Sequence, residues 1–313
     1  MNNAVAPALG RLRDNVRLVY RGDPRGVDLL LTALLSRGHI LIEDVPGVGK
    51  TTLARALGRS LSLDFRRIQF TSDTLPADVI GISVFHAASD RFEFHAGPLF
   101  ANIVLADEIN RATPKTQSAL LEAMNEGAVT VETERRPLPQ PFMVVATQNP
   151  VEYLGTYPLP ESQMDRFFLR LSLGYPSEEE EKMLLRRGGA ERTLSAVPAV
   201  LGPAEVLQLQ NEAEHVTVSD LLLDYLHRLV RATRRNPELR LPVSTRGAQA
   251  LFRATQAYAL LRGRSYATPD DAQAIAEAVL AHRILSTASD GFGAGGRERE
   301  VVRKILAQVA VPV

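Results

Sequence analysis

Between positions 39 and 53 the chain reads His39-Ile40-Leu41-Ile42-Glu43-Asp44-Val45-Pro46-Gly47-Val48-Gly49-Lys50-Thr51-Thr52-Leu53. The apolar residues 40–42 predict a short buried strand, and residues 52–57 predict the start of a helix. The loop between them is rich in glycine and hydroxyl residues and carries one lysine. Such a loop turns backbone N–H groups, an ammonium and a hydroxyl toward phosphate. A strand, loop and helix in this order predict a P-loop.

This loop supplies the candidate nucleotide contacts. Lys50 is expected to reach the β- and γ-phosphate oxygens of ATP, and the Thr51 hydroxyl to ligate Mg²⁺. Asp44 departs from the strict P-loop pattern, because it stands where the first glycine is usual. Glycines alone also occur in ordinary strand-to-helix turns, so that alternative stays open on the loop itself. The predicted nucleotide-binding residues are Pro46, Gly47, Val48, Gly49, Lys50, Thr51 and Thr52.

A second apolar run delivers two carboxylates. Residues 102–106 are typical of a buried parallel strand, and Asp107-Glu108 follows directly. Ligands of open α/β sheets bind at the carboxyl ends of the strands. Asp107 is therefore expected to hold Mg²⁺, and Glu108 to orient and polarise the water that attacks the γ-phosphate. A helix-capping acid pair is the alternative, and the P-loop makes it the minor interpretation.

A third strand, predicted over residues 142–147, ends in Gln148-Asn149-Pro150. The proline stops the strand and leaves Asn149 at its tip. An amide between the acid pair and the phosphate loop can position the attacking water or sense the γ-phosphate. Taken alone, Asn-Pro is more often a plain turn, so this interpretation depends on the order of the motifs.

Together with Leu159-Pro160-Glu161 and Asp165-Arg166-Phe167, these motifs resemble the AAA+ ATPases. Within that group the chain resembles the MoxR branch, which is similar to the magnesium-chelatase ATPase subunit. The resemblance covers most of the first 175 residues. It implies that Asn149 is the first sensor and that Arg166 is an arginine finger that enters the neighbouring subunit's site. A local Asp165–Arg166 surface arrangement is the alternative.

The segment 242–246 resembles the second-sensor motif of the same family. Arg246 stands on the first turn of a predicted helix in the second half of the chain. There a cation opposes the helix dipole, which an anionic ligand would compensate. The resemblance implies that Arg246 contacts the γ-phosphate and couples hydrolysis to motion of a lid. An ordinary surface arginine is the alternative.

The pattern of elements predicts an α/β fold followed by a helical lid. Strands are expected near residues 39–43, 65–71, 103–107, 142–147 and 167–173, separated by helices, which makes a doubly wound parallel five-stranded sheet. We expect an AAA+ α/β nucleotide-binding domain over residues 1–176 and an all-α lid domain over residues 203–313. Residues 177–202 between them are expected to form a linker and the first lid helix, and the linker itself is predicted over residues 191–203.

Two predicted hairpins interrupt the P-loop domain, at residues 78–95 and 129–136. The first is expected to turn at residues 88–90. In MoxR relatives comparable inserts face the central pore of a ring. The resemblance therefore implies that Phe85, Arg135 and Arg136 contact a protein substrate, although an exposed turn with two arginines is usually only solvated.

Composition limits the possible functions. Lys and Arg number 36 and Asp and Glu 36, so no net charge drives binding to nucleic acid or anionic membrane. Cysteine is absent, which excludes disulfides and thiolate metal sites. The six histidines are scattered, and none forms a spaced ligand cluster. The absence of a signal sequence or a long apolar stretch predicts a cytoplasmic protein without membrane insertion.

The resemblance implies an Mg²⁺-dependent ATPase that assembles as a homo-oligomeric ring, a hexamer by analogy, and remodels or matures client proteins. A von Willebrand factor A domain protein is the expected partner. A magnesium-chelatase-type subunit, a nucleic-acid motor and a non-hydrolysing nucleotide-operated scaffold are the alternatives. The balanced charge argues against the motor, and Glu108, Asn149 and Arg166 together argue against the scaffold. Tyr20-Arg21-Gly22 lies where the family contacts the adenine base but differs from its usual form.

Overall fold

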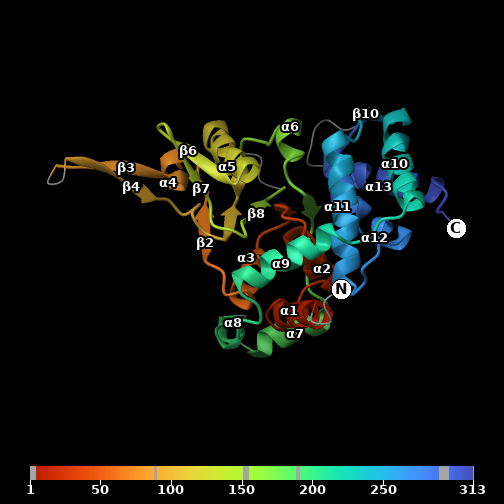
Figure 1. The fold of residues 1–313 in the computed structure, drawn as a ribbon, viewed down its shortest axis with the longest axis horizontal. Helices are drawn as coiled ribbons and strands as arrows, with labels where there is room; N and C mark the ends of the chain where they lie inside the picture. The colour runs from red at the N-terminus through yellow and green to blue at the C-terminus, as the bar shows by residue number, and fades with distance from the viewer. Residues whose placement is uncertain (1–4, 88–89, 151–154, 188–190, 289–295, 313) are drawn as a thin grey trace.

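A five-stranded parallel sheet forms the centre of the computed structural model, which describes residues 5–87, 90–150, 155–187, 191–288 and 296–312. The strand order is β2-β5-β8-β1-β9 (Figure 1). Every neighbouring pair in it is parallel. The strands are β1 Ile40–Glu43, β2 Phe65–Gln69, β5 Ile103–Asp107, β8 Met143–Gln148 and β9 Leu169–Leu171. The predicted sheet is confirmed.

Alternate residues of these strands pack into two cores, one on each face of the sheet. Ile40 and Ile42 belong to the first core, and Leu41 belongs to the second. Burial on both faces explains why β1, β5 and β8 read as largely continuous apolar runs. The first core includes residues of α1 (Val5–Val19), α2 (Pro24–Leu35) and α3 (Lys50–Ser60), and the second those of α4 (Pro76–Ile80) and α5 (Pro114–Glu126). The sheet is therefore doubly wound, as predicted.

Two antiparallel hairpins leave this core. They are β3 (Gly81–His86) with β4 (Arg91–Ala96), and β6 (Ala128–Val131) with β7 (Glu134–Pro137). The β3–β4 hairpin projects from the side of the molecule opposite the lid helices (Figure 1). The two hairpins touch, because the Arg136 guanidinium lies 4.2 Å from the centre of the Phe94 ring. Both hairpins are confirmed, and residues 88–89 of the expected first turn lie outside the described residues.

The second half of the chain forms the lid. Its core continues the first core of the sheet, and α11 packs against α2 as well as against lid helices. Ser219 and Ser244 cap α10 and α11 through their hydroxyls, as their sequence positions indicate. Beyond the expected helices the lid holds an antiparallel pair, β10 (Leu239–Leu241) with β11 (Leu285–Ser286). The helices are α9 Pro203–Glu214, α10 Asp220–Arg235, α11 Thr245–Leu261, α12 Pro269–Leu280, η2 Ala281–Arg283 and α13 Gly296–Gln308.

The segment before the lid is more ordered than the sequence indicated. Residues 191–203 were expected to be a linker, but α8 (Glu191–Ala196) occupies the first half, after α7 (Glu178–Arg187). The linker interpretation was wrong there because Leu194 and Val197 are buried, and α8 packs on α1 and α3. The Val200 N–H also donates to the Ser60 carbonyl at 2.8 Å. These contacts tie the segment to the nucleotide-binding domain.

Two short helices complete the elements of the first domain. They are η1 (Ile109–Arg111), which follows the acid pair, and α6 (Glu161–Met164), which precedes Asp165-Arg166. Among the described residues, no helix combines the length and the apolar character needed to cross a membrane.

His39 connects three elements at the start of β1. Its Nε2 donates to the Met124 carbonyl at the end of α5 (2.9 Å), and its Nδ1 accepts from the Val144 N–H of β8 (3.0 Å). A ring that accepts at one nitrogen and donates at the other is neutral. Burial lowers the pKa of His39 from 6.5 to about 4. Protonation would set the Nδ1 N–H against the Val144 N–H, so the fold disfavours the charged form.

We expect His39 to make the free energy of unfolding depend on pH. Because the folded pKa is about 4 and the ordinary value is 6.5, the unfolded chain binds a proton in this window that the folded chain does not. Stability should fall as the pH drops through the window, by up to about 3 kcal/mol from this residue. Urea unfolding at neutral pH and at about pH 5 checks this. His39→Gln should reduce the loss, and an equal loss in the variant would contradict the assignment.

Candidate active site

The P-loop joins β1 to α3 at the carboxyl edge of the sheet. Gly47 and Gly49 have φ angles of +88° and +92°, in the left-handed region that favours glycine. Gly49 is the N-cap of α3 and has no side chain to satisfy the first N–H groups of that helix. Lys50, Thr51 and Thr52 form the first turn. An uncapped helix N-terminus with this geometry favours the binding of an anion.

Lys50 is held across the mouth of the loop. Its ammonium donates to the Asp44 carbonyl and to the Gln148 carbonyl (3.3 Å) at the end of β8. Burial lowers the pKa of Lys50, and four nearby carboxylates oppose this shift, those of Asp44, Asp107, Glu108 and Glu43. The ammonium therefore lies among the polar groups that end β1 and β8.

Asp44, the departure from the usual P-loop pattern, has a structural role. Its Oδ1 accepts from the Val45 N–H, and its Oδ2 accepts from Ser172 Oγ and from the N–H groups of Leu173 and Gly174, each at 2.8 Å. Burial would raise the pKa of Asp44, but these four hydrogen bonds outweigh it and lower the pKa. A glycine could not make these contacts. Asp44 thus ties the loop to the segment after β9.

The acid pair at the end of β5 is linked through Thr147 of β8. The Thr147 hydroxyl donates to Asp107 Oδ1 (2.5 Å) and accepts from the Glu108 N–H (2.9 Å). Glu108 has φ +58° and ψ +49°, a left-handed conformation that is uncommon for a residue with a side chain. Such backbone strain concentrates at functional sites. It turns Glu108 away from the direction of the strand at the sheet edge.

Two residues of β2 hold these acids, and the sequence analysis missed both. Arg67 donates to Asp107 Oδ2 from Nη2 (2.6 Å) and Nε (3.1 Å), and Gln69 Nε2 donates to Glu108 Oε2 (2.9 Å). Arg111 also reaches Glu108 Oε2, at 3.1 Å. Arg67 and Gln69 are two residues apart, so their side chains lie on the same face of β2. This spacing can be seen in the sequence, but it indicates a role in the site only once β2 is known to pair with β5.

Asn149 follows β8 directly, at the same edge as the P-loop and the acid pair. Its side chain is buried, and its chain neighbour Gln148 provides the carbonyl that accepts from Lys50. The structure therefore brings Lys50, Thr51, Asp107, Glu108 and Asn149 to adjacent strand ends.

Tyr20 packs against the loop from the amino-terminal side. A Cβ on Gly49 would lie 3.3 Å from the Tyr20 ring, and a Cβ on Gly22 would meet the Tyr20 hydroxyl at 2.1 Å. A side chain at position 22 would require the Tyr20 ring to shift. Burial raises the pKa of Tyr20. The Tyr20-Arg21-Gly22 segment thus borders the P-loop.

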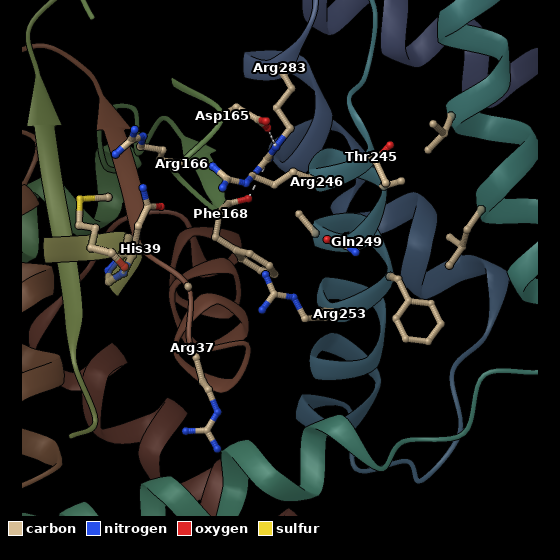
Figure 2. A pocket seen from close by; sticks show the side chains of 18 of the residues that line it. Arg37, His39, Asp165, Arg166, Phe168, Thr245, Arg246, Gln249, Arg253 and Arg283 are labelled. Atoms are coloured by element: carbon tan, nitrogen blue, oxygen red, sulfur yellow. Dashed lines mark hydrogen bonds and ion pairs between the residues drawn. The ribbon is translucent and has the colours of Figure 1, made fainter. Parts of the chain in front are cut away.

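Arg166 and Arg246 lie away from the P-loop. Both line a cavity of about 730 Å³ between the sheet domain and the lid (Figure 2). Gly38 and His39, which precede β1, line its core side, and α10 and α11 line its lid side. None of the described residues 44–51 of the P-loop lines it. Because the P-loop follows β1 and these residues precede it, the two arginines lie at the amino edge of the sheet.

Asp165 docks the lid beside this cavity. Its carboxylate accepts from Arg283 Nε (2.8 Å) and from the Ser244 hydroxyl that caps α11 (3.0 Å). Arg283 also donates to the carbonyls of Phe167 (2.6 Å) and Phe168 (3.1 Å). Burial lowers the pKa of Arg283 to about 10, and Asp165 opposes the shift. Asp165 therefore pairs with the lid rather than with Arg166, as Figure 2 shows.

Arg166 is held separately. Its Nη1 donates to the Leu121 carbonyl of α5 at 3.1 Å. The local Asp165–Arg166 arrangement considered from the sequence is thus not what the structure contains. The capping of α11 by Ser244 places Arg246 in the first turn of that helix, next to the docking contact.

The doubly wound sheet, the P-loop and the acid pair define an AAA-type P-loop ATPase. The family described as "ATPase family associated with various cellular activities (AAA)" matches residues 39–169, and the AAA lid domain matches residues 231–305. A solved structure from Cytophaga hutchinsonii, assigned as an ATPase, superposes with a TM-score of 0.89. It is 37% identical and covers 99% of this chain and 96% of its own.

Curated relatives show which family of AAA-type ATPases the chain resembles. Chaperone MoxR1 of Mycobacterium tuberculosis is 39% identical over 95% of this chain and 80% of its own length. Protein MoxR of Paracoccus denitrificans is 32% identical over 85% of each chain, and protein YeaC of Bacillus subtilis is 48% identical over 98% and 96%. The chain belongs to the MoxR family of AAA+ ATPases. It therefore binds nucleotide and hydrolyses ATP, as its sequence predicted.

We expect Asp165→Asn to destabilise the protein by about 3 kcal/mol, because the buried Arg283 guanidinium would lose its counter-charge. Chemical unfolding of the variant and the wild type measures this difference. Asp14→Asn, which neutralises an exposed carboxylate on α1, is the matched control and should change stability by less than about 0.5 kcal/mol. A loss below about 1 kcal/mol in Asp165→Asn would show that the ion pair does not hold the lid.

Proposed function

We propose that this ATPase acts as a homo-oligomeric ring in which each active site is completed by the neighbouring subunit, and that it uses hydrolysis to remodel or mature client proteins. The observation that carries the proposal is the position of Arg166 and Arg246. Both line one cavity at the amino edge of the sheet, whereas the P-loop lies at the carboxyl edge.

The separation favours action between subunits. The four residues of β1 that separate the two edges span roughly 13 Å, before the loop itself is counted. Arg166 is also anchored to α5, and Arg246 to a helix whose cap is bound by Asp165. Two guanidiniums held on one face suit a phosphoryl group presented by a second copy. In a closed ring every subunit would offer this face to the next.

Within a subunit, we assign the roles of the site residues from their positions at the carboxyl edge of the sheet. Lys50 and the P-loop N–H groups bind the phosphates, Glu108 orients the attacking water, and Asn149 positions it. Thr51 and Asp107 would hold Mg²⁺, since a hydroxyl and a carboxylate are the oxygen donors that this ion prefers. The ion would neutralise phosphate charge. Arg67 contacts Asp107 in the present arrangement, so we infer that it yields or shares that carboxylate when the ion binds.

The client and partner assignments rest on the relatives. One relative is named a chaperone, which supports protein clients. A hexameric ring and a von Willebrand factor A domain partner are the assembly we propose by family analogy. Balanced charge, 36 basic and 36 acidic residues, supports a protein client over a nucleic acid.

Mixing two inactive variants tests the shared site. Glu108→Gln removes the base and keeps Arg166, and Arg166→Ala does the reverse. We expect Arg166→Ala alone to lower kcat by about 10³-fold or more. In a random one-to-one ring, about a quarter of the interfaces would pair an intact base with an intact arginine, so about a quarter of the wild-type rate should return. The ATPase rate per subunit should also rise with protein concentration.

The outcomes separate the claims. A flat rate without rescue would leave the P-loop assignment in place but overturn the shared site and the ring. Arg231→Ala, an exposed arginine of α10, is the control and should keep full activity in the same assays.

The hairpins provide a separate test of client contact. Phe85 and Phe92 pack at 5.2 Å between ring centroids, and their residues are 50% and 68% exposed. Phe85, Arg135 and Arg136 are our proposed client contacts. We expect Phe85→Ser with Arg135→Ser to reduce client-stimulated turnover or remodelling by about tenfold and to leave basal ATPase intact. Unchanged remodelling would remove the hairpins from client binding.

A further inference from the structure

The β3–β4 hairpin has two different faces, because side chains alternate along each strand. Phe85, Phe92 and Phe94 share one face. His86, Glu93 and His95 share the other, since the register pairs Phe85 with Phe92 and Val84 with Glu93. The sequence analysis found no spaced histidine cluster. That conclusion was wrong for this hairpin, because the cluster forms across two strands rather than along one segment.

Three potential ligand atoms converge on the second face. One atom each from His86, Glu93 and His95 lie within 4.8 Å of one another. His86 Nε2 is 3.2 Å from Glu93 Oε2, and the two imidazole rings stack with centroids 5.9 Å apart and planes 26° apart. The side chains of His86 and Glu93 are 43% and 68% exposed, so solvent reaches the cluster.

We propose that His86, Glu93 and His95 bind one divalent transition-metal ion of the Zn²⁺ type. Two imidazoles and one carboxylate are a known three-residue donor set for zinc, with water in the fourth position. Tetrahedral bonds of about 2.0–2.1 Å require ligand atoms about 3.4 Å apart. The His86–Glu93 distance already meets this value. The remaining approach, from at most 4.8 Å, is within the reach of exposed side chains that rotate about their χ angles.

The donor set suits a cation. The three residues provide one carboxylate and two imidazoles, which bind metal in the neutral form. The chain has no cysteine, so no thiolate site competes for the same ion. Of the other four histidines, His39 and His282 are buried within backbone hydrogen bonds. His215 and His227 are exposed, but neither joins a three-residue cluster among the described residues.

Metal binding would change the hairpin itself. An isolated two-stranded hairpin is only marginally stable in water. This one projects from the body of the protein (Figure 1). A metal ion bonded to both strands would join β3 to β4 and order the opposite aromatic face. That face includes Phe85, a proposed client contact, so an effect of metal on client binding rests on the proposed function, whereas the metal site does not.

Metal titration of the full-length chain, without an affinity tag and without nucleotide, tests the site. Co²⁺ is followed by its visible absorption, and Zn²⁺ by competition with a chromophoric chelator. We expect one equivalent per chain. His86→Gln and His95→Gln should each weaken binding by more than about 100-fold, since even outer-shell substitutions cost 10–100-fold. Arg91→Gln is the matched control, because Arg91 pairs with His86 on the same face and is not a ligand.

Hydrogen exchange supplies a second readout. Zn²⁺ should slow the exchange of amides in residues 81–86 and 91–96 in the wild type and in Arg91→Gln, and should not do so in His95→Gln. The absence of saturable binding, or binding that survives both histidine substitutions, would overturn the proposal. These results are independent of the mixed-variant ATPase assay, so either inference can fail without the other.

Discussion

The parallel pairing of β5, β8, β1 and β9 is the constraint on which the rest of the structure depends. Parallel strands bring all their carboxyl ends to one edge, so the P-loop, Asp107-Glu108 and Asn149 meet there although about a hundred residues of chain separate them. The same pairing sends the residues that precede each strand to the opposite edge. Arg166, just before β9, therefore lies far from the phosphate loop of its own chain.

The lid packs against that opposite edge. Arg283 of the lid donates hydrogen bonds to the carbonyls of Phe167 and Phe168 and to the Asp165 carboxylate. Asp165 also binds the Ser244 cap of α11, so one carboxylate fixes both the docking of the lid and the start of the helix that carries Arg246. Packing of α11 against α2 extends this contact into a shared hydrophobic core. The two arginines thus line one cavity beside this contact.

Around the phosphate loop, polar groups are held by neighbouring strands rather than by neighbours in sequence. Thr147 bridges Asp107 and Glu108, Gln69 and Arg67 hold their carboxylates, and Gln148 positions Lys50. The contacts of Thr147, Gln69 and Arg67 join adjacent strands of the sheet or the residue that follows a strand, and the contact of Gln148 joins β8 to the first turn of α3. The positions of these polar groups therefore depend on how the strands pair.

The sequence by itself determined the class of fold, the P-loop, the acid pair and the hairpins, because glycine, proline, capping residues and apolar periodicity act locally. It also indicated Arg166 and Arg246 through resemblance. Only the tertiary structure decided that these arginines share a cavity away from the P-loop, that α8 packs where a linker was expected, and that Arg67 and Gln69 hold the acids. The histidine cluster on β3–β4 is also a feature that only the tertiary structure shows. Each depends on which strands and helices become neighbours, and pairing between distant segments leaves no local pattern in the chain.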